Sequence, residues 1–160
     1  MYEILRNKLE DKTAKIGVIG LGYVGLPLAV AFAEEGYEVY GIDTGIKRVN
    51  SIRHGKSYIL DVPSEKVEKL VSSGLLNATD NYRVVKKLDA IIICVPTPLG
   101  KTKEPDISYI VSAVDDIIKN RRKGQLYVLE STTYPGTTEE ILLPKFKEGS
   151  YRIDRDFFLA

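Results

Sequence analysis

The sequence predicts an α/β domain built on one doubly wound parallel sheet with helices on both faces. Apolar segments rich in β-branched residues alternate along the chain with segments of helical periodicity, and parallel strands need such crossover helices. The length of 160 residues, 44% of them hydrophobic, suits a single domain with its own core. A glycine-rich turn after the first apolar segment is the third indication, because it allows a helix to begin close to a strand end.

A short charged helix is expected at 3–11, ahead of the first strand. Ile4, Leu5 and Leu9 fall on one side of it. We therefore divide the chain into a lead-in at 1–14 and a nucleotide-binding domain at 15–160.

Glycines are expected to end the helices in the first half of the domain. Gly36, Gly55 and Gly74 each follow a helical segment, where glycine favours the left-handed turn that ends a helix. The expected elements are strand 15–20, helix 22–35, strand 38–43, helix 46–54 and helix 63–73, with Pro63 in the first turn of the last.

The second half begins with a continuous apolar run at 90–95, typical of a strand buried on both faces. Thr137 and Glu140 have the spacing of a capping box, which predicts a helix from Thr137 to about Phe146. The remaining expected elements are an amphipathic helix at 106–123, a strand at 126–130 and the start of a strand at 157–159.

Composition excludes several classes of protein. The net charge of +1 provides no basic surplus for nucleic acid or a membrane surface, and one cysteine excludes a disulfide framework. No cluster of His, Cys and Asp has metal-ligand spacing. The basic run Lys119–Lys123 is interpreted as complementing a helix dipole, as is His54 at another helix end. We expect a soluble, cytoplasmic protein.

The uncharged segment Ile16–Ala33 has nearly the length of a membrane span and ends like a signal-peptide cleavage site. It contains several glycines and Pro27, which are poor material for a continuous apolar helix. Acidic residues precede it, whereas in a signal peptide the n-region, which comes before the apolar segment, is positive. We therefore interpret it as part of the domain.

The turn after the first strand reads Gly20-Leu21-Gly22-Tyr23-Val24-Gly25, the G-x-G-x-x-G spacing of Rossmann-type dinucleotide sites. In that motif Gly20 would make the turn, Gly22 would let a pyrophosphate approach, and Gly25 would let the helix pack on the strand. The motif alone is weak evidence. Here it lies between an expected strand and an expected helix, and an acid follows at the end of the next strand.

That acid, Asp43, bears on the choice of cofactor. A carboxylate accepts hydrogen bonds from the ribose hydroxyls of NAD but repels the 2′-phosphate of NADP. Arg48 and Lys47 follow closely and could offset that repulsion. We expect NAD.

Hydroxyl side chains follow two later strands. Thr97 lies between two prolines in Val95–Pro98, and Thr132 lies in Glu130–Thr133. The carboxyl ends of parallel strands meet at one edge of a sheet, where ligands bind. Paired hydroxyls there suit a polar, ribose-rich ligand, although turn chemistry would explain part of the pattern.

Together these segments resemble the UDP-glucose/GDP-mannose dehydrogenases, which are NAD-dependent nucleotide-sugar 6-dehydrogenases. The resemblance is carried by Lys15–Pro27, Val95–Pro98 and Ser131–Thr132. With the strand pattern it extends over nearly the whole chain after residue 14. Leu129–Glu140 looks most like members that oxidise UDP-N-acetylhexosamines such as UDP-N-acetylglucosamine, and next most like the enzymes for UDP-glucose and UDP-N-acetylmannosamine.

The resemblance implies roles for individual residues. Tyr23 and Val24 would line the pyrophosphate, and Asp43 would hold the adenosine ribose with Arg48 near the adenine. Thr97 and Thr132 would flank the nicotinamide half. The expected cofactor-binding set is Gly20, Gly22, Tyr23, Val24, Gly25, Asp43, Arg48, Thr97 and Thr132.

The chain departs from the family pattern in its chemistry. Members of the family oxidise the sugar C6 alcohol to a carboxylate with two NAD, through a cysteine nucleophile in a Gly-x-Cys context well beyond position 160. The only cysteine here, Cys94, lies in an apolar run and is expected to be a buried side chain. We therefore expect no catalytic residue in this chain and no activity from it alone. The domain would be truncated at its last strand, without the central helical and substrate domains, and the full-length enzyme would be a homo-oligomer that binds a UDP-sugar.

Two other interpretations remain open. The chain could be a stand-alone NAD- or nucleotide-sensing module, which explains the glycine loop and Asp43 but not Val95–Pro98. It could also be the cofactor domain of a β-hydroxyacid-type dehydrogenase, which has a similar glycine loop and uses a downstream lysine.

Overall fold

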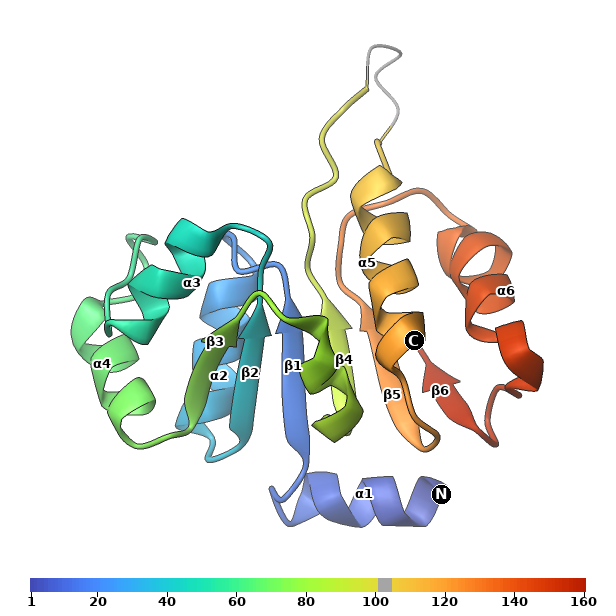
Figure 1. Cartoon of the computed structure of the whole chain (residues 1–160), viewed down its shortest axis with the longest axis horizontal. Helices are drawn as coiled ribbons and strands as arrows, with labels where there is room; N and C mark the ends of the chain where they lie inside the picture. Colours follow the sequence, from blue (N-terminus) through green and yellow to red (C-terminus); the bar gives the residue numbers. More distant parts are fainter. Residues whose placement is uncertain (101–104) are drawn as a thin grey trace.

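Six parallel strands form the centre of the computed structural model, which describes residues 1–100 and 105–160 (Figure 1). Their order is β3-β2-β1-β4-β5-β6, the doubly wound order in which strands are added on one side of β1 up to β3 and on its other side from β4 onward. The predicted α/β class, the parallel sheet and the single domain are confirmed. The strands are β1 (Lys15–Ile19), β2 (Glu38–Ile42), β3 (Leu76–Thr79), β4 (Ala90–Ile93), β5 (Gln125–Leu129) and β6 (Phe157–Leu159).

Helices cover both faces of this sheet (Figure 1). One face carries α2 (Gly25–Glu34), α3 (Ile46–Arg53) and α4 (Ser64–Ser72). The other carries the 3₁₀ segment η1 (Tyr82–Lys87), α5 (Ser108–Asn120), the π-helical turn η2 (Thr137–Leu142) and α6 (Leu143–Phe146), followed by a short turn, η3 (Glu148–Ser150). The remaining helix, α1 (Tyr2–Glu10), lies across the amino ends of the strands.

The strands contribute alternate side chains to two cores. On β4, Ala90 and Ile92 face the α2 side, while Ile91 and Ile93 face the α5 side, and all four are buried. A strand buried on both faces has no polar positions, which explains the continuous apolar run in the sequence. The second core is completed by aromatic packing, with the rings of Tyr127 and Phe146 stacked 4.3 Å apart.

A buried carboxylate ties α1 to the sheet. Asp89 accepts hydrogen bonds from Lys8 Nζ at 2.8 Å, Arg122 Nη2 at 2.7 Å and the backbone N–H of Lys15 at 3.0 Å. Burial alone would raise the pKa of Asp89, but these donors outweigh it and lower the pKa below 3.8. The expected apolar side of this helix is only partly correct, because Leu5 is buried while Ile4 is 65% exposed.

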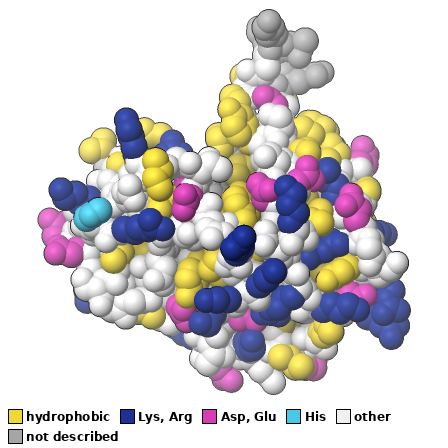
Figure 2. Space-filling model, in the orientation of Figure 1, with side chains coloured by type: hydrophobic (Ala, Val, Ile, Leu, Met, Phe, Trp, Pro, Cys, Tyr) yellow, Lys and Arg dark blue, Asp and Glu magenta, His cyan; other side chains and the backbone are white. Residues whose placement is uncertain are grey.

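The long amphipathic helix is shorter than predicted. It ends at Asn120, and its C-cap Arg121 is already extended with ψ of 163°, so of the basic run only Lys119 lies in the last turn of the helix. Arg121 instead donates to the carbonyls of Phe146 and Glu148, Arg122 binds Asp89, and Lys123 pairs with Asp156. Figure 2 shows most of the Lys and Arg side chains of this face in its lower half, near the amino ends of the strands.

The predicted capping box is wrong. The turn begins at Gly136, whose φ of 92° is left-handed, and Gly136 rather than Thr137 precedes the first helical residue. Thr137 is buried, and its hydroxyl bonds to Thr133 Oγ1 at 2.6 Å and to the Tyr134 carbonyl at 2.9 Å. The helix it was expected to open is a π-helical turn followed by four α-helical residues.

Three smaller predictions can be compared with the structure. Pro63 precedes α4 as its cap instead of lying in its first turn. His54 caps the end of α3 as expected, with ring Nδ1 2.7 Å from the Asn50 carbonyl oxygen. The segment Ile16–Ala33 forms β1, the glycine turn and most of α2, and no helix among residues 1–100 and 105–160 is long and apolar enough to cross a membrane.

Candidate functional site

Two adjoining cavities open at the carboxyl edge of the sheet, where the strand order reverses between β1 and β4. Their volumes are about 220 and 410 Å³, and they share Gly20, Arg48, Val95 and Pro96. We call them the first and the second cavity. This edge is where doubly wound sheets bind their ligands.

The three glycines of the loop have different surroundings. Gly20 has φ of 89°, and a β-carbon built on it would lie 2.6 Å from the Cys94 carbonyl oxygen. A β-carbon on Gly25 would overlap the Gly20 carbonyl oxygen, whereas one on Gly22 would meet no atom within 4 Å. Gly20 and Gly25 are therefore required by the packing of the chain itself. The space beside Gly22 is open to a ligand, as a close pyrophosphate requires.

Backbone donors gather beside that open space. Within residues 1–100 and 105–160, the backbone N–H groups of Gly22, Tyr23, Val24 and Gly25 donate to no protein acceptor. The first turn of α2 carries no acidic side chain, and Tyr23 and Val24 are 85% and 59% exposed. Free N–H groups at the positive end of a helix dipole form an anion site, so this loop fits a dinucleotide pyrophosphate.

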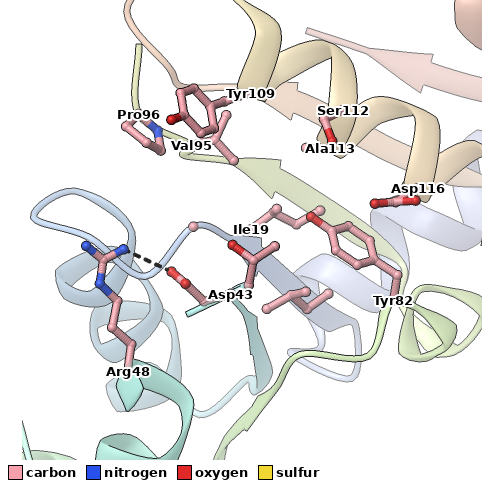
Figure 3. A pocket seen from close by; sticks show the side chains of 13 residues that line it. Ile19, Asp43, Arg48, Tyr82, Val95, Pro96, Tyr109, Ser112, Ala113 and Asp116 are labelled. Atoms are coloured by element: carbon pink, nitrogen blue, oxygen red, sulfur yellow. Dashed lines mark hydrogen bonds and ion pairs between the residues drawn. The ribbon is translucent and has the colours of Figure 1, made fainter. Parts of the chain in front are cut away.

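Asp43 lies at the end of β2 and is 6% exposed. Its Oδ2 accepts the Leu21 N–H at 2.7 Å, and its Oδ1 accepts the Gly45 N–H at 2.7 Å. Arg48 Nη1 is 3.4 Å from Oδ2, and both side chains line the first cavity (Figure 3). A carboxylate has about four lone-pair positions, so Asp43 anchors the glycine loop and retains capacity for a ligand hydroxyl.

The far wall of the first cavity was not predicted from the sequence. It is formed by Tyr82 of η1 and by Tyr109, Ser112 and Asp116 of α5, whose side chains converge in Figure 3. Burial raises the pKa of Tyr82 to about 12, so its hydroxyl stays protonated. No local motif marks these residues, since η1 and α5 meet only in the folded chain.

The second cavity brings the two predicted threonines together. Thr97 and Thr132 line it with Tyr23, Val24 and Glu130. Ser131, between Glu130 and Thr132, has another task, because its Oγ donates to the Val95 carbonyl at 2.8 Å and ties the ends of β4 and β5 together. The expected pairing of Thr97 and Thr132 at one rim is therefore present, and their role toward a ligand stays a prediction.

Eight of the nine expected site residues line one cavity or both: Gly20, Gly22, Tyr23, Val24, Asp43, Arg48, Thr97 and Thr132. The ninth, Gly25, lies behind the loop and packs α2 against Gly20.

Cys94 borders the second cavity but is only 8% exposed. Burial, with a smaller effect of Glu130, raises the pKa of its thiol to about 11. A protonated, buried thiol is a poor nucleophile. No group of three or more His, Cys, Asp or Glu side chains in the described ranges is arranged to hold a metal ion.

Comparison with known proteins connects this geometry to a family. Residues 14–159 match the family model described as "UDP-glucose/GDP-mannose dehydrogenase family, NAD binding domain". The UDP-N-acetyl-D-glucosamine 6-dehydrogenase of Pseudomonas aeruginosa is 38% identical over 148 residues, which are 92% of this chain and 34% of that protein. The chain thus spans about a third of the length of such curated relatives.

Solved structures support the same relationship. The UDP-D-ManNAc dehydrogenase of Pyrococcus horikoshii superposes with a TM-score of 0.85 at 35% identity, covering 91% of this chain and 35% of that one. The 3-hydroxyisobutyrate dehydrogenase of Mycobacterium tuberculosis reaches a TM-score of 0.59 at 15% identity, over 91% of this chain and 38% of that one. That second likeness shows the fold alone.

The resemblance seen in the glycine loop and at the two later strand ends is therefore confirmed, and so is the expected cofactor. The chain belongs to the UDP-glucose/GDP-mannose dehydrogenase family and carries its NAD-binding domain.

Proposed function

We propose that this chain is the cofactor-binding part of an NAD-dependent UDP-sugar 6-dehydrogenase, with a UDP-N-acetylhexosamine as substrate. The observation that carries the proposal is the glycine loop with open space beside Gly22, next to the first cavity, which Asp43 lines. The two relatives named above, which act on UDP-N-acetylglucosamine and UDP-ManNAc by name, support the choice of sugar.

The residues divide the cofactor between the two cavities. Asp43 would accept hydrogen bonds from the adenosine ribose, with Arg48 at the adenine end and the Tyr82 ring as an apolar wall. The N–H groups of Tyr23 and Val24 would bind the pyrophosphate. Thr97 and Thr132 would hold the nicotinamide half in the second cavity. Bound there, NAD would accept the hydride removed from the sugar C6 in each of two oxidations.

The nucleophile of the two oxidations would not come from this chain. The only thiol is buried and protonated at neutral pH. The chain by itself would therefore bind NAD without oxidising a UDP-sugar. In the full-length protein, which we place in the cytoplasm as a homo-oligomer, further segments would supply the nucleophile and the sugar site.

Of the two other interpretations, neither is favoured by an observation in this structure. The likeness to 3-hydroxyisobutyrate dehydrogenase is confined to the fold. A sensing module would bind NAD equally well, and it would be distinguished by the absence of UDP-sugar oxidation in the full-length protein.

The preference for NAD is tested by Asp43→Ala. Loss of the carboxylate removes the ribose acceptor, which weakens NAD, and removes the repulsion of a 2′-phosphate, which favours NADP. Because Asp43 also holds Leu21, part of the loss affects both cofactors. Calorimetric titration should therefore show NAD weakened more than NADP, by about tenfold in the ratio of their dissociation constants. An equal loss for both cofactors would contradict the ribose role.

A further inference from the structure

Leu21, between the first two glycines of the loop, is held at three points. Its side chain is fully buried over Gly41, where a β-carbon would lie 2.7 Å from Leu21 Cδ2. Its N–H donates to Asp43 at 2.7 Å. Its carbonyl accepts a hydrogen bond of 2.6 Å from the Tyr58 hydroxyl. The last contact joins residues 37 positions apart and has no counterpart in the glycine motif.

Tyr58 is itself fixed in place. It lies between α3 and α4, where the Ser57 N–H donates to Ser64 Oγ at 3.0 Å and Ser57 Oγ donates to the Ile59 carbonyl at 3.1 Å. Ile59 is buried, and the Tyr58 ring packs against the core on the α2 side of the sheet. The hydroxyl is therefore presented to the loop by an ordered segment.

The contact determines how one peptide group is oriented. The Leu21–Gly22 peptide is trans, as are all peptide bonds of the structure that are described. In a trans peptide the C=O and the N–H point in opposite directions. Holding the Leu21 carbonyl toward Tyr58 therefore directs the Gly22 N–H away from Tyr58, and Gly22 and Tyr23 both line the second cavity.

We propose that Tyr58 is a positioning residue for the pyrophosphate: its hydroxyl fixes the Leu21–Gly22 peptide so that the following N–H groups are arranged for the anion before the cofactor binds. This inference rests on NAD binding at the glycine loop. An arranged set of donors binds more tightly because less ordering is needed on association.

Tyr58 can perform this task across the working pH range. Burial, reinforced by the nearby charge of Asp43, raises the pKa of its hydroxyl well above the ordinary value of 10.0. The hydroxyl therefore remains a donor.

The test is Tyr58→Phe, which removes the hydroxyl and keeps the ring. Tyr37→Phe is a matched control, because the Tyr37 hydroxyl also donates to a backbone carbonyl, that of Leu9, at 2.7 Å and far from the cavities. Each variant is titrated with NAD, ADP-ribose and adenosine, the first two by calorimetry and adenosine by amide chemical shifts. Adenosine lacks the pyrophosphate, so it reports on the adenosine cavity alone.

We expect Tyr58→Phe to weaken NAD and ADP-ribose about three- to tenfold, the value of one hydrogen bond, and to leave adenosine unchanged. Tyr37→Phe should bind all three ligands as the wild type does. The proposal is overturned if Tyr58→Phe binds NAD normally, or if adenosine weakens by the same factor as ADP-ribose, since the hydroxyl would then support the fold in general. Failure of the wild type to bind NAD or ADP-ribose would instead overturn the NAD site, and this proposal with it.

Discussion

The glycine loop offers a pair of substitutions that separate folding from binding. Gly22→Ala and Gly25→Ala add the same methyl group to the same loop. At Gly25 it would overlap the Gly20 carbonyl oxygen, so α2 would have to move away from β1. At Gly22 it meets no protein atom within 4 Å, and the backbone φ there is outside the left-handed range.

Only the change at Gly25 should therefore lower the free energy of unfolding. Overpacking costs about 1–3 kcal/mol, and Gly25→Ala should reach the upper end because its neighbour is backbone. In a domain of this size that lowers Tm by about 6–12 °C. Gly22→Ala should be neutral or stabilising by up to about 1 kcal/mol, since alanine restricts the unfolded chain.

For NAD binding, in contrast, we expect a clear loss from Gly22→Ala. The Gly22→Ala methyl occupies the space that the pyrophosphate needs, and we expect NAD to bind at least about tenfold more weakly. NAD present at about 100 times the wild-type Kd stabilises the wild type by about 2.7 kcal/mol, and a tenfold weaker variant by only about 1.4 kcal/mol. Urea unfolding with and without NAD measures both quantities. A Gly22→Ala variant that unfolds as easily as Gly25→Ala, or that gains the full NAD stabilisation, would refute this account of the loop.

Two further predictions concern buried groups. Asp89→Asn should lower the free energy of unfolding by about 1–3 kcal/mol at neutral pH. The pKa of Asp89 in the folded chain lies below its ordinary value of 3.8. The stabilisation by its carboxylate is therefore complete above pH 3.8 and is lost as the pH falls through the pKa of the folded chain. Urea unfolding at pH 7 and below pH 3.8 should show the difference from wild type shrinking in acid, and a constant difference would contradict the ion-pair role. Cys94, whose pKa is raised to about 11, should react with iodoacetamide at neutral pH about two to three orders of magnitude more slowly than a free thiol of ordinary pKa. Rapid labelling of the folded chain, followed by mass spectrometry, would show that the thiol is accessible after all.

Local patterns were sufficient to predict most of the fold. The β4 run is apolar at every position because both faces are covered, and that signal lies within four consecutive residues. The glycine loop was predictable because its spacing lies within six consecutive residues, although only Gly25 is required by a contact inside the motif, whereas Gly20 is required by the distant Cys94. Asp43 could be predicted as a site residue because it comes directly after the residues that form β2.

What the sequence did not reveal depends on contacts between distant segments. β3 is a four-residue edge strand, Leu76–Thr79, with alternate positions buried, too short to distinguish from a loop. Tyr58 and Tyr82 reach the site from segments with no motif of their own.

The capping-box pattern at Thr137 failed for a related reason. The left-handed Gly136 begins the turn one residue earlier and directs the Thr137 hydroxyl toward Thr133. The spacing of a capping-box motif does not fix the first residue of a helix when the preceding residue adopts a left-handed backbone conformation.

The position of NAD across the glycine loop, at the carboxyl edge of the sheet, can be measured residue by residue. Amide ¹H–¹⁵N correlation spectra recorded during a titration with NAD test it most directly. We expect saturable shifts, with one NAD per chain, at Gly22, Tyr23, Val24, Asp43, Thr97 and Thr132. Spectra that do not change at millimolar NAD, or shifts grouped around α4 with the glycine loop unaffected, would contradict it.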